Sequence, residues 1–192
     1  MMVPLCYVFM WAVSKNSWIS AFTTALLVFD FMHFTLSRIG TIDIIVACFI
    51  LLTFYLMYLV LKRLKHGIDR CTVLLMILNG CAAGAAMATK WTGVYAGAGI
   101  ALMFFLFLMQ EYIPAHGKRD ILTLFGICVA VYLCIPAVIY VLSYLSYPMQ
   151  PGEHLLKKMW DNQVLMLTYH ESTVFDHPYS SEWYEWIWMK RP

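Results

Sequence analysis

The sequence predicts an all-α, polytopic transmembrane helix bundle followed by an external amphipathic helix and loop. Of its 192 residues, 62% are hydrophobic and only 12% are charged, a composition that excludes a disordered chain and a soluble domain. Several successive apolar stretches approach the roughly 20 residues that a helix needs to cross a bilayer. The formal net charge of only +2 argues against nucleic-acid binding by phosphate neutralisation.

Six apolar stretches mark the predicted spans in order. They cover residues 1–13, 18–36, 39–61, 71–88, 94–109 and 121–147. The first is too short to cross the bilayer, and we interpret it as the end of a truncated span in a piece of a longer protein. Residues 1–147 are therefore predicted to form the transmembrane helices, and residues 148–192 an external juxtamembrane segment.

The distribution of Lys and Arg between the short connections predicts the orientation. Most cations fall in the first, third and fifth connections, whereas the second and fourth hold only Arg38 and Lys90. Cytoplasmic loops carry the excess of positive charge. The even connections and the tail are therefore predicted to face the outside of the cell membrane.

Cysteine and glycine within the spans are interpreted as packing residues. None of the six cysteines forms a CxxC pair, and all lie in or beside apolar spans, where Cys packs as a small hydrophobe. Two glycine pairs, Gly80 with Gly84 and Gly93 with Gly97, have the small-xxx-small spacing that lets helix backbones approach closely. No redox or metal site is predicted from these residues.

Ionisable groups near the external ends of the second and third spans are the main functional candidates. Asp30 and His33 are three residues apart, which predicts one shared helix face, and Arg38 and Asp43 flank the next turn. Charges at such positions are normally paired or face a wet cavity. His33 is interpreted as a packing histidine more readily than as a catalyst.

Arg38 has two possible roles. It either snorkels to the interface or pairs with Asp43, or else it binds an anion such as a lipid phosphate, for which the planar guanidinium is suited. Lys90 reaches the same leaflet from another hairpin, and simple snorkelling beside Trp91 is equally compatible with its position. Asp43 is expected to orient Arg38 rather than to act as an acid or base.

The tail after residue 147 begins with the helix-breaking sequence PMQPGE, and an amphipathic helix is predicted for residues 153–167. We expect that helix to lie on the membrane surface or to cap the bundle. The aromatic-rich segment beyond it contains His170 and His177, whose spacing matches no compact zinc pattern, so no metal is predicted. Hydrolase, P-loop and dinucleotide-binding fingerprints are also missing.

Three segments together resemble a known family. FDFMHFTLSRIGTID, ATKWTGVYAGAG and HPYSSEWYEWIWMKRP, in this order, are similar to segments of the bacterial protein O-mannosyltransferases, glycosyltransferases with the GT-C membrane fold. SRIGTID resembles the family's Arg-x-x-x-x-Asp element, which contains Arg38 and Asp43 here. TKWTG resembles its external turn with Lys90, and HPYSSEWYEW, which contains His177, resembles the segment before a further span.

The resemblance implies transfer of mannose from a polyprenyl-phosphate carrier to Ser or Thr hydroxyls of secreted polypeptides at the external face of the cell membrane. Arg38 and Lys90 would bind the donor phosphate, with Asp43, His33 and His177 in supporting positions. The family's catalytic acidic pair lies in a loop after the first span, and no residue of this chain matches it. We therefore expect no catalytic residue here, no cofactor beyond the lipid-linked donor, and an inactive fragment when the chain is expressed alone.

Two other functions remain open from the sequence. The same kind of donor could serve a GT-C enzyme that modifies a glycolipid or a cell-wall polymer. A membrane transporter or proton relay would also require charged residues within or beside its spans, although transporters usually place them near the midplane. The charges of this chain are instead predicted to lie toward one surface.

Overall fold

A computed structural model describes residues 1–148, 152–172, 182, 184 and 185, and every regular element in these residues is helical. The chain divides into an N-terminal unit, Met1–Ser146, and a C-terminal unit, Tyr147–Pro192. The helices of the N-terminal unit are α1 (Met2–Ser14), α2 (Ser17–Phe29), α3 (Phe31–Ile39), α4 (Ile42–Leu64), α5 (Arg70–Thr89), α6 (Thr92–Phe107), η1 (Leu108–Tyr112), α7 (Ile113–Ala115), α8 (Lys118–Val129), η2 (Ala130–Cys134), α9 (Ile135–Ser143) and η3 (Tyr144–Ser146).

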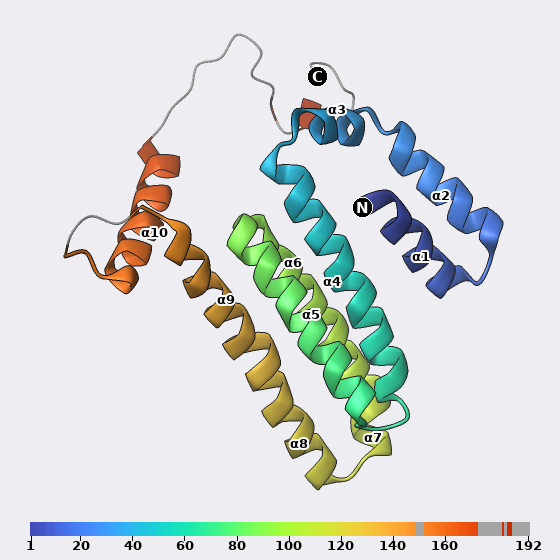
Figure 1. Ribbon diagram of the computed structural model, residues 1–192. Coiled ribbons are helices and arrows are strands. Elements are labelled where there is room, and N and C mark those ends of the chain that lie inside the picture. The colour runs from blue at the N-terminus through green and yellow to red at the C-terminus, as the bar shows by residue number, and fades with distance from the viewer. Residues whose placement is uncertain (149–151, 173–181, 183, 186–192) are drawn as a thin grey trace. The chain divides into compact units, whose positions relative to one another are not determined.

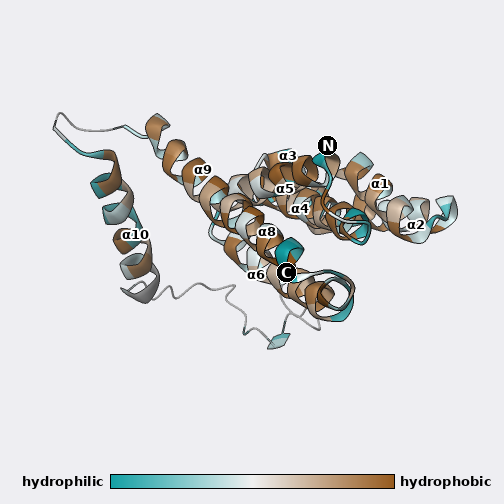
Figure 2. Cartoon of the chain, turned by 90° about the horizontal axis from the view of Figure 1, so that it is seen from below, coloured by the Kyte–Doolittle hydropathy of each residue, from teal (hydrophilic) through white to brown (hydrophobic). Residues whose placement is uncertain are grey.

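Four continuous helical segments of the described chain are long and apolar enough to cross a membrane. They are Ile42–Leu64, Arg70–Thr89, Thr92–Ala115 and Lys118–Ser146, and a fifth is added if the bent α2–α3 pair counts as one span. Figure 2 shows hydrophobic residues along most of α8 and α9. The prediction of an all-α, polytopic membrane bundle is therefore confirmed, and α1, with 13 residues, is the short apolar helix expected at the start.

The second predicted span is not one straight helix. α2 and α3 meet at 60°, and the break lies at Asp30, whose backbone is extended. The Asp30 carboxylate accepts a hydrogen bond from the His33 backbone N–H at 2.6 Å, so Asp30 is the N-cap of α3. Asp30 thus lies at the break between two helices rather than inside one straight span, and the expected shared face of the Asp30 and His33 side chains stays a prediction.

The glycines of α5 allow close contact with the last span. A Cβ atom at Gly80 would lie 2.4 Å from the backbone oxygen of Val131, and one at Gly84 would lie 2.9 Å from Cα of Pro136. Figure 1 shows α5 in the middle of the N-terminal unit. The predicted close approach of helix backbones at these glycines is confirmed, because any larger side chain would collide with the η2–α9 backbone.

Two π-helical turns, η1 and η2, occur where a proline follows shortly in the same span. Pro114 is in α7 and Pro136 is in α9, each near the start of the helix that follows the π turn. Proline lacks the backbone N–H that would bond the carbonyl four residues earlier, and a π turn is one way to rearrange the affected hydrogen bonds. Both spans remain continuous through their prolines.

The C-terminal unit contains α10 (Leu155–Ser172). This helix begins two residues later and ends five residues later than the helix predicted for residues 153–167. Lys158 forms an ion pair with Glu153 at 3.1 Å, and its ammonium lies 5.8 Å from the centre of the Tyr147 ring. The salt bridge and the cation–π contact therefore connect α10 with the residues that precede it.

Candidate functional site

α4 and α5 are antiparallel, so the start of α4 and the end of α5 lie at the same end of the N-terminal unit (Figure 1). Here the Lys90 ammonium meets the Asp43 carboxylate, with Nζ and Oδ1 2.5 Å apart. The two residues are separated by 47 positions in the sequence. The fold therefore brings together two of the predicted site residues, one from the start of α4 and one from the end of α5.

Local structure explains the position of each partner. α3 ends at Gly40, whose φ of 72° is readily accessible only to glycine, and α4 begins two residues later. Asp43 is thus in the first turn of α4, where a carboxylate interacts favourably with the helix dipole. Lys90 is the C-cap of α5, and its extended backbone leads into the turn before α6. A cation is favoured at that helix end for the same reason.

Arg38 lies in the last turn of α3, five positions before Asp43 in the chain. Its guanidinium carbon is 5.3 Å from the centre of the Phe34 ring, a cation–π contact within one helix. Among the ion pairs of the described residues, Asp43 pairs with Lys90, and Arg38 takes part in none. The orientation of Arg38 by Asp43 stays a prediction, whereas Lys90 is the partner that the structure records.

The other two supporting residues are placed differently. The His33 side chain is half-buried, and the hydrogen bond of His33 to Asp30 comes from its backbone N–H. His177 lies outside the described residues.

A neighbouring contact was missed by sequence reasoning. The Trp91 indole N–H donates a hydrogen bond to the Tyr140 hydroxyl at 3.4 Å, which connects the α5–α6 turn with α9. Nothing in the sequence distinguishes Tyr140 from the other tyrosines of the apolar last span. The last span therefore contributes to the same end of the bundle as Lys90.

Both charged partners remain accessible. The Lys90 and Asp43 side chains keep 43% and 44% of their surface exposed, so solvent or a ligand can reach the ammonium.

The six cysteines are free thiols. In the described part of the chain, no three His, Cys, Asp or Glu residues gather closely enough to hold a metal ion.

Comparison with known proteins decides the family. The family model for dolichyl-phosphate-mannose-protein mannosyltransferases matches residues 1–146. The chain belongs to this family. It is therefore a multi-pass membrane protein of a mannosyltransferase family, and the family resemblance inferred from the sequence segments is confirmed. Searches of curated proteins and of solved structures return no match.

The matched region coincides with the N-terminal unit and includes Arg38, Asp43 and Lys90. Membership of this family implies, in general, a lipid-linked mannose donor and a protein acceptor.

Proposed function

We propose that the end of the bundle formed by Arg38, Asp43 and Lys90 binds the phosphate of a polyprenyl-phosphate-mannose donor. The observation that carries this proposal is the Lys90–Asp43 ion pair, which positions an exposed ammonium beside the α3–α4 turn that follows Arg38. Two cations from separate hairpins would then approach one anion at headgroup depth. Arg38 would supply its planar guanidinium, and Lys90 a compact point charge.

Such an arrangement suits the chemistry of mannosyl transfer. When the bond between mannose and the carrier breaks, negative charge develops on the lipid phosphate, and fixed cations lower the free energy of that transition state. Asp43 would hold the Lys90 ammonium in place before the donor arrives. The acceptor hydroxyl needs a carboxylate to take its proton, and no carboxylate of this chain is assigned that role.

We further propose that the acceptor is a Ser or Thr hydroxyl of a secreted polypeptide, on the external face of the cell membrane. The support for this face is the small number of Lys and Arg residues in the connections that contain Arg38 and Lys90. A transporter is less well supported, because Arg38, Asp43 and Lys90 are at helix ends rather than in the middle of a span.

Donor binding tests the site directly. The full-length protein would be purified in detergent, and its affinity for a polyprenyl-phosphate-mannose would be measured for the wild type, Arg38→Gln and Lys90→Gln. Each substitution is expected to weaken binding about tenfold, because it removes a charge-assisted hydrogen bond to phosphate. Lys118→Gln, which removes one charge at the opposite end of the bundle, is the control and should bind like the wild type. Equal affinity of all four proteins would reject the site.

Competition between acceptors tests the second half of the proposal. A Ser/Thr-containing peptide and a glycolipid would be offered together with a radiolabelled donor to the full-length protein. Label in the peptide is the expected result. Preferential labelling of the glycolipid would leave the proposed donor site intact and would identify a glycolipid, rather than a polypeptide, as the acceptor.

A further inference from the structure

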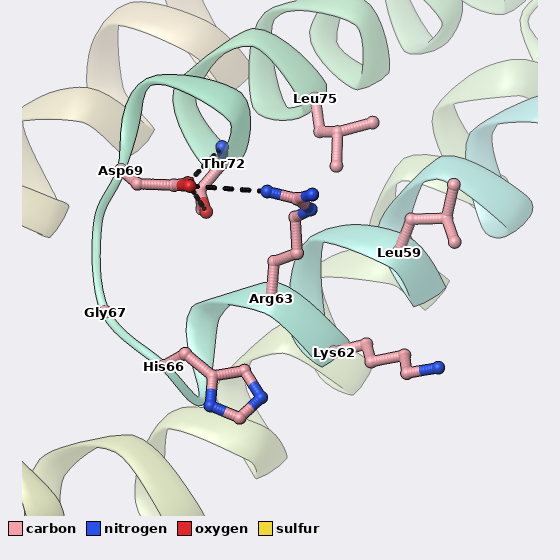
Figure 3. A pocket seen from close by; sticks show the side chains of 8 residues that line it. All are labelled: Leu59, Lys62, Arg63, His66, Gly67, Asp69, Thr72 and Leu75. Carbon is pink, nitrogen blue, oxygen red and sulfur yellow. Dashed lines mark hydrogen bonds and ion pairs between the residues drawn. The ribbon is translucent and has the colours of Figure 1, made fainter.

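A cavity of about 540 Å³ lies at the other end of α4 and α5, where the two helices are joined by the 65–69 loop (Figures 1 and 3). Lys62, Arg63 and His66 line it from the end of α4 and the loop, and Asp69 and Thr72 line it from the start of α5. None of these residues belongs to the Arg38–Lys90 site, which is at the opposite helix ends.

The lining of this cavity is arranged in two layers. Leu59 precedes Lys62 by three residues on α4, and Leu75 follows Thr72 by three residues on α5. Because a helix rises 1.5 Å per residue, each leucine lies about 5 Å deeper toward the bundle centre than its polar neighbour. α4 and α5 are membrane spans, so the leucines lie at acyl-chain depth, and the cations lie closer to the headgroups.

The carboxylate in the cavity is held by its own helix. Asp69 caps α5: one oxygen accepts bonds from the Thr72 backbone N–H at 2.7 Å and from the Thr72 hydroxyl at 2.5 Å. Its other oxygen is 3.3 Å from Nη1 of Arg63. These contacts hold the guanidinium against the cavity wall, as Figure 3 shows, and about half of the Arg63 side-chain surface remains exposed.

The charges in the lining do not cancel. Lys62 is exposed and pairs with no carboxylate of the described residues, so two cations face one carboxylate. The neighbouring carboxylate Glu111 is already paired with Lys65 at 2.5 Å. A cavity with net positive charge therefore opens at headgroup depth above an apolar layer.

We propose that this cavity binds an anionic phospholipid of the leaflet opposite the Arg38–Lys90 site. Its phosphate lies between Lys62 and Arg63, His66 can add a hydrogen bond, and one acyl chain lies against Leu59 and Leu75. The apolar layer favours a lipid over a free anion, because inorganic phosphate gains nothing from the leucines. Clusters of Lys and Arg beside a span attract anionic headgroups in this way.

Lipid retention by the purified full-length protein provides the test. The protein in mild detergent would be incubated with phosphatidylglycerol or with phosphatidylcholine, and bound lipid would be counted by native mass spectrometry. The wild type is expected to retain phosphatidylglycerol preferentially. Lys62→Gln should lower that affinity about fivefold, the effect of one cation near an anionic headgroup, and Lys62→Arg should preserve it. Lys62 has no side-chain partner in the described chain, so its substitution leaves the fold intact.

A matched control separates the cavity from general charge. Lys118, at the start of α8, lies at the same end of the bundle but does not line the cavity, so Lys118→Gln should retain phosphatidylglycerol like the wild type (Figure 1). An equal loss with Lys62→Gln and Lys118→Gln would overturn the proposal. So would equal retention of the two lipids, or displacement of phosphatidylglycerol by inorganic phosphate at millimolar concentration.

Discussion

The two ends of α5 have charged caps that are held in different ways. At its start, Asp69 pairs with Arg63, only six positions away, across the loop that joins α4 and α5. At its end, Lys90 pairs with Asp43, 47 positions away, where the first turn of α4 meets the end of α5. The first arrangement forms with a local turn, whereas the second exists only when α4 and α5 are packed together. A substitution elsewhere in the bundle can therefore displace the Lys90 ammonium, because its position depends on how the helices pack.

The largest expected effect of a substitution concerns Arg38, at the Lys90 end. Arg38→Ala should lower mannosyl transfer by the full-length protein about 100-fold, the typical loss when one donor to a developing oxyanion is removed. Initial rates with a saturating acceptor peptide measure it. Lys118→Ala, which removes a cation at the opposite end of the bundle, should change the rate less than about twofold. Equal losses in the two variants would mean that the ends do not differ in function.

Packing along α5 comes next. Gly80→Leu should destabilise the protein by roughly 2 kcal/mol, because its Cβ would lie 2.4 Å from the backbone oxygen of Val131. Thermal unfolding in detergent measures the change. Gly126→Ala is the control: a Cβ there meets nothing within 4 Å, and alanine favours a helix, so stability should not fall. A Gly80→Leu protein with unchanged stability would contradict close contact between α5 and η2.

A smaller effect is expected when the Lys90–Asp43 pair itself is tested by a double-mutant cycle. Lys90→Gln, Asp43→Asn and the double variant should give a coupling energy of about 0.5 kcal/mol in unfolding, a low value because both side chains are more than two-fifths exposed. High salt should reduce it further. If the effects of the two substitutions are additive, this ion pair does not contribute to the stability of the bundle.

Lowering the pH should slightly reduce the contribution of Asp69 to the stability of the protein. The hydrogen bonds from Thr72 lower the pKa of the Asp69 carboxyl below its usual value, with a smaller contribution from Arg63. A carboxyl whose pKa is lowered by folding stabilises the protein above its ordinary pKa, and this contribution is lost as the pH falls through the lowered pKa. As the pH is lowered from neutral through the lowered pKa, the melting temperature of the wild type should therefore fall slightly more than that of Asp69→Asn. Parallel curves would exclude Asp69 as the cause.

The sequence predicted the order and the approximate positions of the long spans well, because about 20 consecutive apolar residues have few alternatives to a membrane helix. The four long spans beginning at Ile42, Arg70, Thr92 and Lys118 all correspond to predicted stretches. The break at Asp30 was missed because hydropathy averages over a window, whereas a cap depends on one side chain and its own backbone conformation.

The sequence alone was sufficient for the fold class, for the family and for the choice of Arg38 and Lys90 as candidates, since these depend on composition and on short ordered segments. Only the tertiary structure decided that Asp43 meets Lys90, that Trp91 reaches Tyr140, and that the α4–α5 hairpin encloses a positively charged cavity. The physical reason is the sequence distance over which each interaction acts. Hydropathy and capping are properties of neighbouring residues, whereas an ion pair across 47 positions depends on how two helices pack.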